Sequence, residues 1–254
     1  MTRRVTILMA VALTGSGLVI AAVAWAAQTL TARLTFTPDR LGASTSLSVK
    51  AEFHSPAGGV PAPVRKVTAY LPAGLEIDLR GAGICDATRL QEGGPEACPA
   101  DSRLGYGGGT GLLELAGEVI REPFTLDLFA GPSEGGRLVI LAYVNASSPA
   151  SYQIVVAAKE IHAAKPYGLG FTFEVPLIPT LPGASDASIA SASFTLGDNR
   201  AAYFKRIHGR KKLVHIRGIV VPKSCPRRGF PYAALISFAD NSALTYTGTI
   251  RCPG

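Results

Sequence analysis

The sequence predicts an all-β protein: an antiparallel β-sandwich, Ig-like or larger, of about a dozen strands, preceded by an N-terminal signal helix. Three observations support this prediction. Apolar and polar residues alternate over many short segments, which is typical of strands that bury one face. The 254-residue chain has 28 glycines and 18 prolines, and turn residues separate these segments. Helical periodicity is scarce, so the alternating faces favour sheets packed face to face.

Residues 1–26 have the three parts of a secretory signal peptide. A basic start with two arginines is followed by an apolar run, and the small residues Ala24 and Ala26 suit cleavage after Ala26. Alternatively, the apolar run stays uncleaved as a single anchor, since it is close to the ~20 residues that a bilayer requires. Both interpretations predict an exported protein, secreted or held at the cell surface. The N-terminal segment, if uncleaved, would be its only membrane contact.

The β-sandwich region is predicted to span residues 27–254. In its first strand Leu30, Ala32, Leu34 and Phe36 share one face, and threonines and an arginine occupy the other. The same alternation recurs along the chain. It predicts strands over residues 30–36, 47–53, 124–129, 137–144, 152–157, 171–177, 191–196, 202–207, 213–221, 232–239 and 243–251.

Three segments do not show plain alternation. Residues 86–92 are predicted to form one or two helical turns with Asp86 as the cap, ended by two glycines. Residues 112–120 fit a helix or a strand, and Gly117 favours the strand. The Pro-rich segment near residues 176–186 is where the region would divide if it forms two units.

Four cysteines in an exported chain predict two disulfides. Cys85 and Cys98 would close a local loop. Between Cys225 and Cys252 the chain reverses direction twice, so both cysteines should reach the same end of the sheet and pair there. Each loop would stabilise the fold by ~3 kcal/mol in the chain-entropy model. Metal-binding and redox pairs need much closer spacing than Cys85 and Cys98 have.

No motif in the sequence predicts catalysis, a metal or a cofactor. The glycine-rich residues 105–111 lack the Lys-Ser/Thr of a phosphate-binding loop and are expected to be a flexible lead-in to the next strand. The signatures of serine nucleophiles, of HExxH zinc sites and of calcium loops are absent. A dispersed pair of carboxylates would leave no motif. The carboxylates considered, all expected on solvent faces of strands, are Glu114, Glu118, Glu122 and Asp127.

Two parts of the chain resemble a recurrent pattern in uncharacterised exported bacterial proteins. The first is Leu-Pro-Ala-Gly-Leu at 71–75, then Cys85, then Cys-Pro-Ala-Asp-Ser-Arg-Leu-Gly at 98–105. The second is a C-terminal pair of strands between Cys225 and Cys252, with Asn241-Ser242 where glycine is common. The resemblance implies export and a β-rich fold. It implies no activity.

Charge is unevenly distributed along the chain. Residues 199–239 contain ten Lys or Arg and no Asp or Glu, whereas acidic residues outnumber basic ones over the rest of the predicted mature chain. The centre of this window is predicted to be the turn of a hairpin, and its basic side chains have two interpretations, of which strand protection is the favoured one and anion binding the functional one. Its candidate anion-binding residues are Lys205, Arg206, Arg210, Lys211 and Lys212. Alternatively, these side chains only protect exposed strands from pairing with neighbouring molecules.

The expected function is therefore non-catalytic: a cell-surface or extracellular interaction module. Outside the cell, the polyanions that attract a basic surface are anionic wall polymers, acidic polysaccharide and lipid headgroups rather than nucleic acid. Two other functions stay open. One is a secreted hydrolase with a dispersed, unrecognised active site, and the other is a structural subunit of a surface layer.

Overall fold

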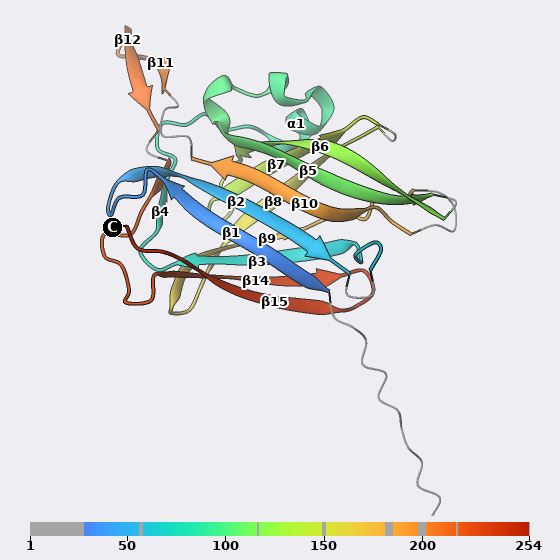
Figure 1. Ribbon diagram of the computed structural model, residues 1–254. Helices are drawn as coiled ribbons and strands as arrows, with labels where there is room; N and C mark the ends of the chain where they lie inside the picture. Colours follow the sequence, from blue (N-terminus) through green and yellow to red (C-terminus); the bar gives the residue numbers. More distant parts are fainter. Residues whose placement is uncertain are drawn as a thin grey trace, which may run out of the picture.

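The computed structural model confirms the all-β, antiparallel, sandwich-like fold (Figure 1). It describes residues 28–55, 58–115, 117–148, 151–180, 185–197, 202–216 and 218–253. The signal peptide or anchor predicted for residues 1–26 lies outside these residues. The strands are β1 (Thr29–Thr37), β2 (Ser44–His54), β3 (Val64–Pro72), β4 (Glu76–Asp78), β5 (Arg103–Leu115), β6 (Glu118–Ala130), β7 (Val139–Ala146), β8 (Tyr152–His162), β9 (Tyr167–Glu174), β10 (Ser188–Leu196), β11 (Ala202–Ile207), β12 (Arg210–His215), β13 (Gly218–Val220), β14 (Phe230–Phe238) and β15 (Ala243–Ile250).

Thirteen of the described strands form one sheet, in the order β15-β14-β3-β9-β8-β7-β6-β5-β10-β2-β13-β4, with β1 paired to β2. The sheet curls over on itself, with β1, β2 and β10 in front of β8 and β9 (Figure 1). The edge strand β1 meets β14 and β15 where the hydroxyls of Tyr232 and Tyr246 both donate to the Ala32 carbonyl oxygen, at 3.0 and 2.8 Å. The fold thus brings its first strand beside its last.

The core lies between the two layers that this curl creates. Its buried residues come from both: Leu47 from β2 and Leu126 from β6 lie in the same cluster as Phe171 from β9. Phe36 of β1 and Phe230 of β14 meet edge to face, with ring centroids 5.9 Å apart. In strands such as β1, β2 and β6 every second residue faces this cluster, which is why the period-two pattern was visible in the sequence.

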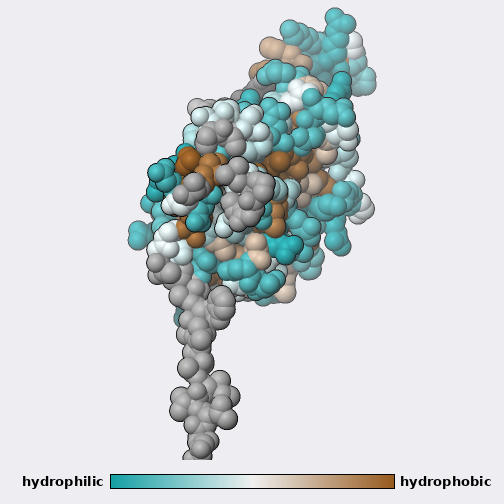
Figure 2. Space-filling view, turned by 90° about the vertical axis from the view of Figure 1, so that its right-hand side faces the viewer, coloured by the Kyte–Doolittle hydropathy of each residue, from teal (hydrophilic) through white to brown (hydrophobic). Residues whose placement is uncertain are grey.

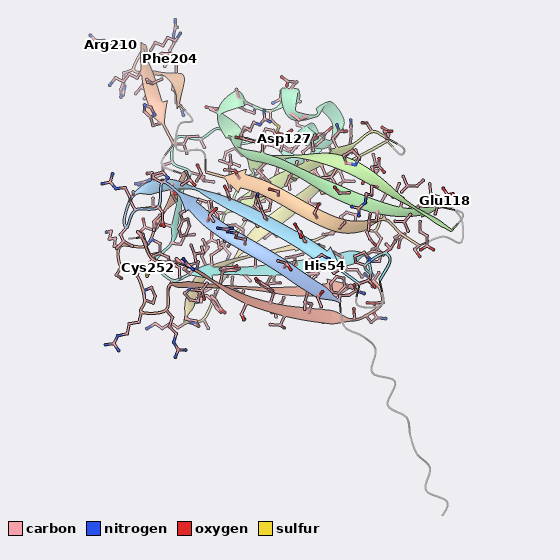
Figure 3. All side chains as sticks on the ribbon, in the orientation of Figure 1. His54, Glu118, Asp127, Phe204, Arg210 and Cys252 are labelled. Carbon is pink, nitrogen blue, oxygen red and sulfur yellow. A yellow bond between two sulfur atoms is a disulfide. The ribbon has the colours of Figure 1, made fainter. Side chains whose placement is uncertain are left out.

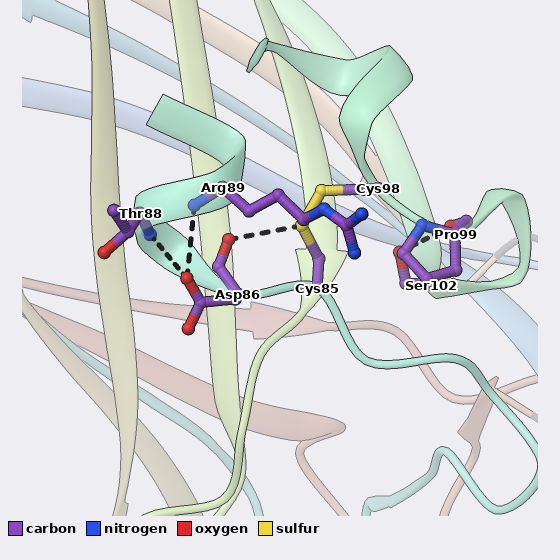
Figure 4. The surroundings of a disulfide bond; sticks show 7 residues. All are labelled: Cys85, Asp86, Thr88, Arg89, Cys98, Pro99 and Ser102. Carbon is purple, nitrogen blue, oxygen red and sulfur yellow. Dashed lines mark hydrogen bonds between the residues drawn. A yellow bond between two sulfur atoms is a disulfide. The ribbon is translucent and has the colours of Figure 1, made fainter. Parts of the chain in front are cut away.

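A short helical segment covers part of the outer surface. It consists of α1 (Ala87–Gly93), η1 (Pro95–Ala97) and η2 (Ala100–Ser102). The predicted cap is present: the Asp86 carboxylate accepts from the backbone N–H groups of Thr88 and Arg89 (Figure 4). The Gln91 side chain donates to the Gln153 carbonyl and accepts from the Val155 N–H. Through these two bonds α1 satisfies the hydrogen bonding of backbone groups of β8.

Two local expectations were wrong, and two strands were missed. The glycine-rich residues 105–111 are the interior of β5, paired to β6 on one side and β10 on the other, and not a flexible lead-in. The strand expected over 213–221 is two strands, because Gly218 has a φ of 63° that extended residues do not adopt. β3 and β4 were not foreseen.

Two further segments fit the sequence reasoning. Residues 112–120 are strand on both sides of Gly117, whose φ of 83° makes the turn between β5 and β6. At the turn between β14 and β15, Asn241 has a φ of 64°, a conformation that asparagine tolerates better than most residues. The segment near 176–186 follows β9, and its division into two units stays a prediction; β2 and β10, from either side of it, pair with each other.

The glycines of β5 allow neighbouring strands to approach closely, and this can be tested by substitution. A Cβ at Gly107 would overlap the Ser193 carbonyl oxygen and the Cβ of Phe194, whereas a Cβ at Gly111 would meet nothing closer than 3.5 Å. We expect Gly107→Ala to lower the free energy of unfolding by about 1–3 kcal/mol, because the neighbouring backbone must shift. Gly111→Ala should be nearly neutral. Urea unfolding measures both, and equal effects would contradict this explanation of the glycines.

The contact of Tyr232 and Tyr246 with β1 predicts that the folded protein loses stability at alkaline pH. Burial, and the neighbouring Tyr246 hydroxyl, raise the pKa of Tyr232 from 10.0 to about 12. The unfolded chain releases this proton above pH 10 and the folded chain retains it, so the stabilisation is complete below pH 10 and is lost as the pH rises to 12. We expect the urea midpoint to fall over this interval, and to fall less in Tyr232→Phe. An identical pH dependence in the two proteins would refute this role of Tyr232.

Candidate functional site

The basic hairpin, β11 and β12, stands apart from the rest of the structure. Its two strands pair with each other and with no other strand of the described chain. Figure 1 shows it projecting beyond the sandwich. His208 and Gly209 connect the strands with φ values of 51° and 79°, the left-handed pair typical of a tight two-residue turn. An isolated two-stranded hairpin is only marginally stable in water. Because β11 and β12 join no other described strand, a contribution to the core does not explain their sequence.

The register of the hairpin sorts its side chains onto two faces. Directly opposed residues of an antiparallel pair share a face. Phe204 opposes Leu213 and Arg206 opposes Lys211, so these four lie on one face. On the other face, Lys205 opposes Lys212 and Ile207 opposes Arg210. Each face therefore combines cations with apolar side chains.

The five predicted anion-binding residues come together on this hairpin, and all five are exposed. None of them takes part in the salt bridges found among the described residues, which all lie on the body. Two successive opposed pairs, Lys205–Lys212 and Arg206–Lys211, bring like charges together, and this destabilises the hairpin. The hairpin thus presents a concentrated positive charge that no described acidic side chain neutralises.

Two apolar side chains of the hairpin are exposed to an unusual degree. Phe204 is 63% exposed and Leu213, directly opposite, is 51% exposed. The Lys211 ammonium lies 4.6 Å from the centroid of the Phe204 ring, a cation–π contact. In Figure 2 the projection is mostly hydrophilic, with a hydrophobic spot among the polar atoms. Neither residue was assigned a role from the sequence, although both are apolar residues within a strongly basic segment.

More cations lie at the same end of the molecule. Lys223, Arg227 and Arg228 are exposed in the loop between β13 and β14. Figure 3 places the hairpin, with Arg210 at its end, and Cys252 toward the same side of the sandwich. The first residues of β1 lie toward the opposite side (Figure 1). The basic hairpin and the second disulfide therefore lie on the side remote from the start of the first strand.

Both predicted disulfides are present. Cys85 pairs with Cys98 and Cys225 with Cys252, with Cα–Cα distances of 5.2 and 5.8 Å. The first ties α1 to the turns that lead into β5 (Figure 4). The second joins the loop after β13 to the end of the chain, beside the added cations. Two disulfides are compatible with an extracellular protein.

Two carboxylates beside the pockets of the body have structural partners. Two shallow pockets near β4 are lined by Glu76, Asp78 and Glu160, among others. Asp78 forms an ion pair with Arg80, and Glu160 accepts from the Leu138 N–H. Within the described part of the chain, no three His, Cys, Asp or Glu residues are placed to hold a metal ion.

One expectation about the carboxylates was wrong. Glu114 and Glu118 are exposed, and Asp127 forms an ion pair with Arg103, but Glu122 is fully buried. Glu122 opposes Gly111, and a Cβ at that glycine would lie 3.7 Å from the hydroxyl of Tyr152. Burial, together with the Glu122 charge, raises the pKa of Tyr152. This carboxylate therefore belongs to the interior of the sheet.

Comparison with protein-family models, with curated proteins and with solved structures gives no match to this chain. In the residues described, no helix is both long and apolar enough to cross a bilayer. The basic hairpin is accordingly identified as the candidate site from its own geometry and charge.

Proposed function

We propose that the protein is an exported, non-catalytic cell-surface or extracellular module that binds anionic envelope components through the basic hairpin. The observation that carries this proposal is the set of five exposed cations on a projecting hairpin, with no acidic residue between positions 199 and 239. The partners it fits share one chemistry, a dense array of phosphate, carboxylate or sulfate groups. Anionic wall polymers, acidic polysaccharide and lipid headgroups all have it.

Protection of exposed strand edges does not explain the hairpin as well as binding does. Edges can be protected by charged side chains, and acidic ones placed opposite basic ones would also stabilise the ladder. Here Lys205 opposes Lys212 and Arg206 opposes Lys211, an arrangement that costs the hairpin stability. A bound polyanion would remove this repulsion. Binding therefore accounts both for the sign of the charges and for their placement.

Export supports the same proposal. The signal peptide predicted for residues 1–26 and the two disulfides both suit an oxidising compartment outside the cytosol. In that compartment a basic surface meets envelope polyanions rather than chromosomal DNA. The proposed partner class follows from location and charge together.

The test is binding to two defined probes, dextran sulfate in solution and phosphatidylglycerol vesicles. We expect binding to at least one of them, and we expect it to weaken as salt rises, because the interaction is between exposed charges. The double variant Lys211→Glu/Lys212→Glu should weaken it about 30-fold or more, since each cation near an anionic surface contributes about 1 kcal/mol. Titration at two salt concentrations measures both effects.

A matched control is available on the body. Arg33 and Lys50 are also directly opposed and exposed, on β1 and β2. Arg33→Glu/Lys50→Glu changes the net charge by the same amount and should leave most of the affinity intact. If the protein binds neither probe, or if both double variants lose the same affinity, the proposed role of the hairpin is wrong.

A further inference from the structure

We propose that the basic hairpin recognises an anionic lipid surface, with Phe204 and Leu213 entering the headgroup region while the cations contact lipid phosphates. This inference rests on the proposed function, because it assumes that the hairpin is the binding site. It goes further by naming one partner class and the two side chains that make contact with its apolar part.

The geometry of one hairpin face carries the argument. Phe204 and Leu213 oppose each other directly and form an apolar pair that spans both strands. The next pair on the same face, toward the turn, is Arg206 and Lys211. With this face toward a bilayer, the apolar pair would lie below the phosphates, and the two long cationic side chains of the next pair would extend back up to them. Basic residues beside exposed aromatic and aliphatic ones are the pattern of segments that lie in a membrane interface.

The exposed apolar pair favours a lipid surface over a soluble polyanion as the partner. A wall polymer or acidic polysaccharide would be bound by the cations, and a sugar ring would stack on Phe204 at most; it offers no apolar layer that buries Leu213 as well. A bilayer offers phosphates and an apolar layer within a short distance of each other. Phe204 at 63% and Leu213 at 51% exposure therefore both have a partner only in the second case.

The position of the hairpin allows such an approach. It projects beyond the sandwich, so the body does not obstruct a flat surface (Figure 1). Lys223, Arg227 and Arg228 are exposed in the loop that Cys225 ties to Cys252, which lies toward the same side as the hairpin (Figure 3), and they would add attraction over a longer range. Docking through this end leaves the start of β1 directed away from the surface that is bound.

Tryptophan fluorescence provides a direct test. Trp25 is the only tryptophan in the chain. In a Trp25→Phe background, Phe204→Trp reports the surroundings of position 204 alone. We expect its emission to move to shorter wavelength, and to be quenched by lipids brominated in the acyl chains, with phosphatidylglycerol vesicles but not with neutral phosphatidylcholine vesicles. Val119→Trp in the same background is the control, because Val119 is 50% exposed on the body; its emission should not change.

A second variant distinguishes insertion of Phe204 into the bilayer from electrostatic attraction by the cations. Phe204→Ser should weaken binding to phosphatidylglycerol vesicles about 10-fold or more, the loss expected when a phenylalanine side chain is no longer buried. It should leave binding to dextran sulfate unchanged, because the cations are intact. Phe204 belongs to none of the core clusters of the described chain, so the variant should fold like the parent protein.

The outcomes distinguish the two proposals. If vesicles are bound in a salt-dependent way but the Phe204→Trp emission shows that position 204 stays in water, and Phe204→Ser binds as well as the parent, insertion is wrong. The proposed function then stands, with binding to anionic groups through the cations alone. If the Phe204→Trp emission responds equally to neutral and anionic vesicles, the requirement for anionic lipid is wrong. If neither vesicles nor dextran sulfate is bound, both proposals fail.

Discussion

The requirement that buried backbone groups be hydrogen-bonded is the constraint on which the rest of the structure depends. Thirteen strands meet it within a single antiparallel sheet, and the curl of that sheet encloses the core. Where the ladder ends, other groups take over: the Gln91 side chain bonds backbone groups of β8, and two tyrosine hydroxyls bond the Ala32 carbonyl of β1. The close approach of the strands at Gly107 and Gly109 of β5 serves the same hydrogen bonding, because side chains there would force the neighbouring strands away from β5.

The basic hairpin lies outside this hydrogen-bonded sheet. β11 and β12 extend no ladder of the body, and their exposed side chains contribute little to its core. Packing therefore does not determine which residues the hairpin contains, and the repulsion between opposed cations acts against its stability. A segment that the fold neither needs nor favours, and that concentrates one sign of charge with two exposed apolar side chains, is best explained by an interaction with something outside the chain.

Much of the architecture could be predicted because alternation is a local property. β15 and the cap at Asp86 follow from neighbouring residues alone. The Cys85–Cys98 disulfide follows from the closeness of its cysteines in the chain, and Cys225–Cys252 from the order of the strands. β3 was missed because the adjacent residues Arg65 and Lys66 are both exposed, which breaks the alternation. Glycine composition suggested a loop where close packing of three strands requires glycine. The exposure of Phe204 could not be foreseen, because alternation marks an apolar face without showing whether anything covers it.

Hydrogen exchange of the whole chain, with and without phosphatidylglycerol vesicles, tests the central claim most directly. Without vesicles, amides of residues 202–215 should exchange much faster than those of β5 and β6, because the hairpin has no layer packed on it. With vesicles, we predict new protection concentrated in residues 202–215. Bound protein in which the hairpin gains no protection, or in which protection appears on the sandwich faces instead, would contradict the claim.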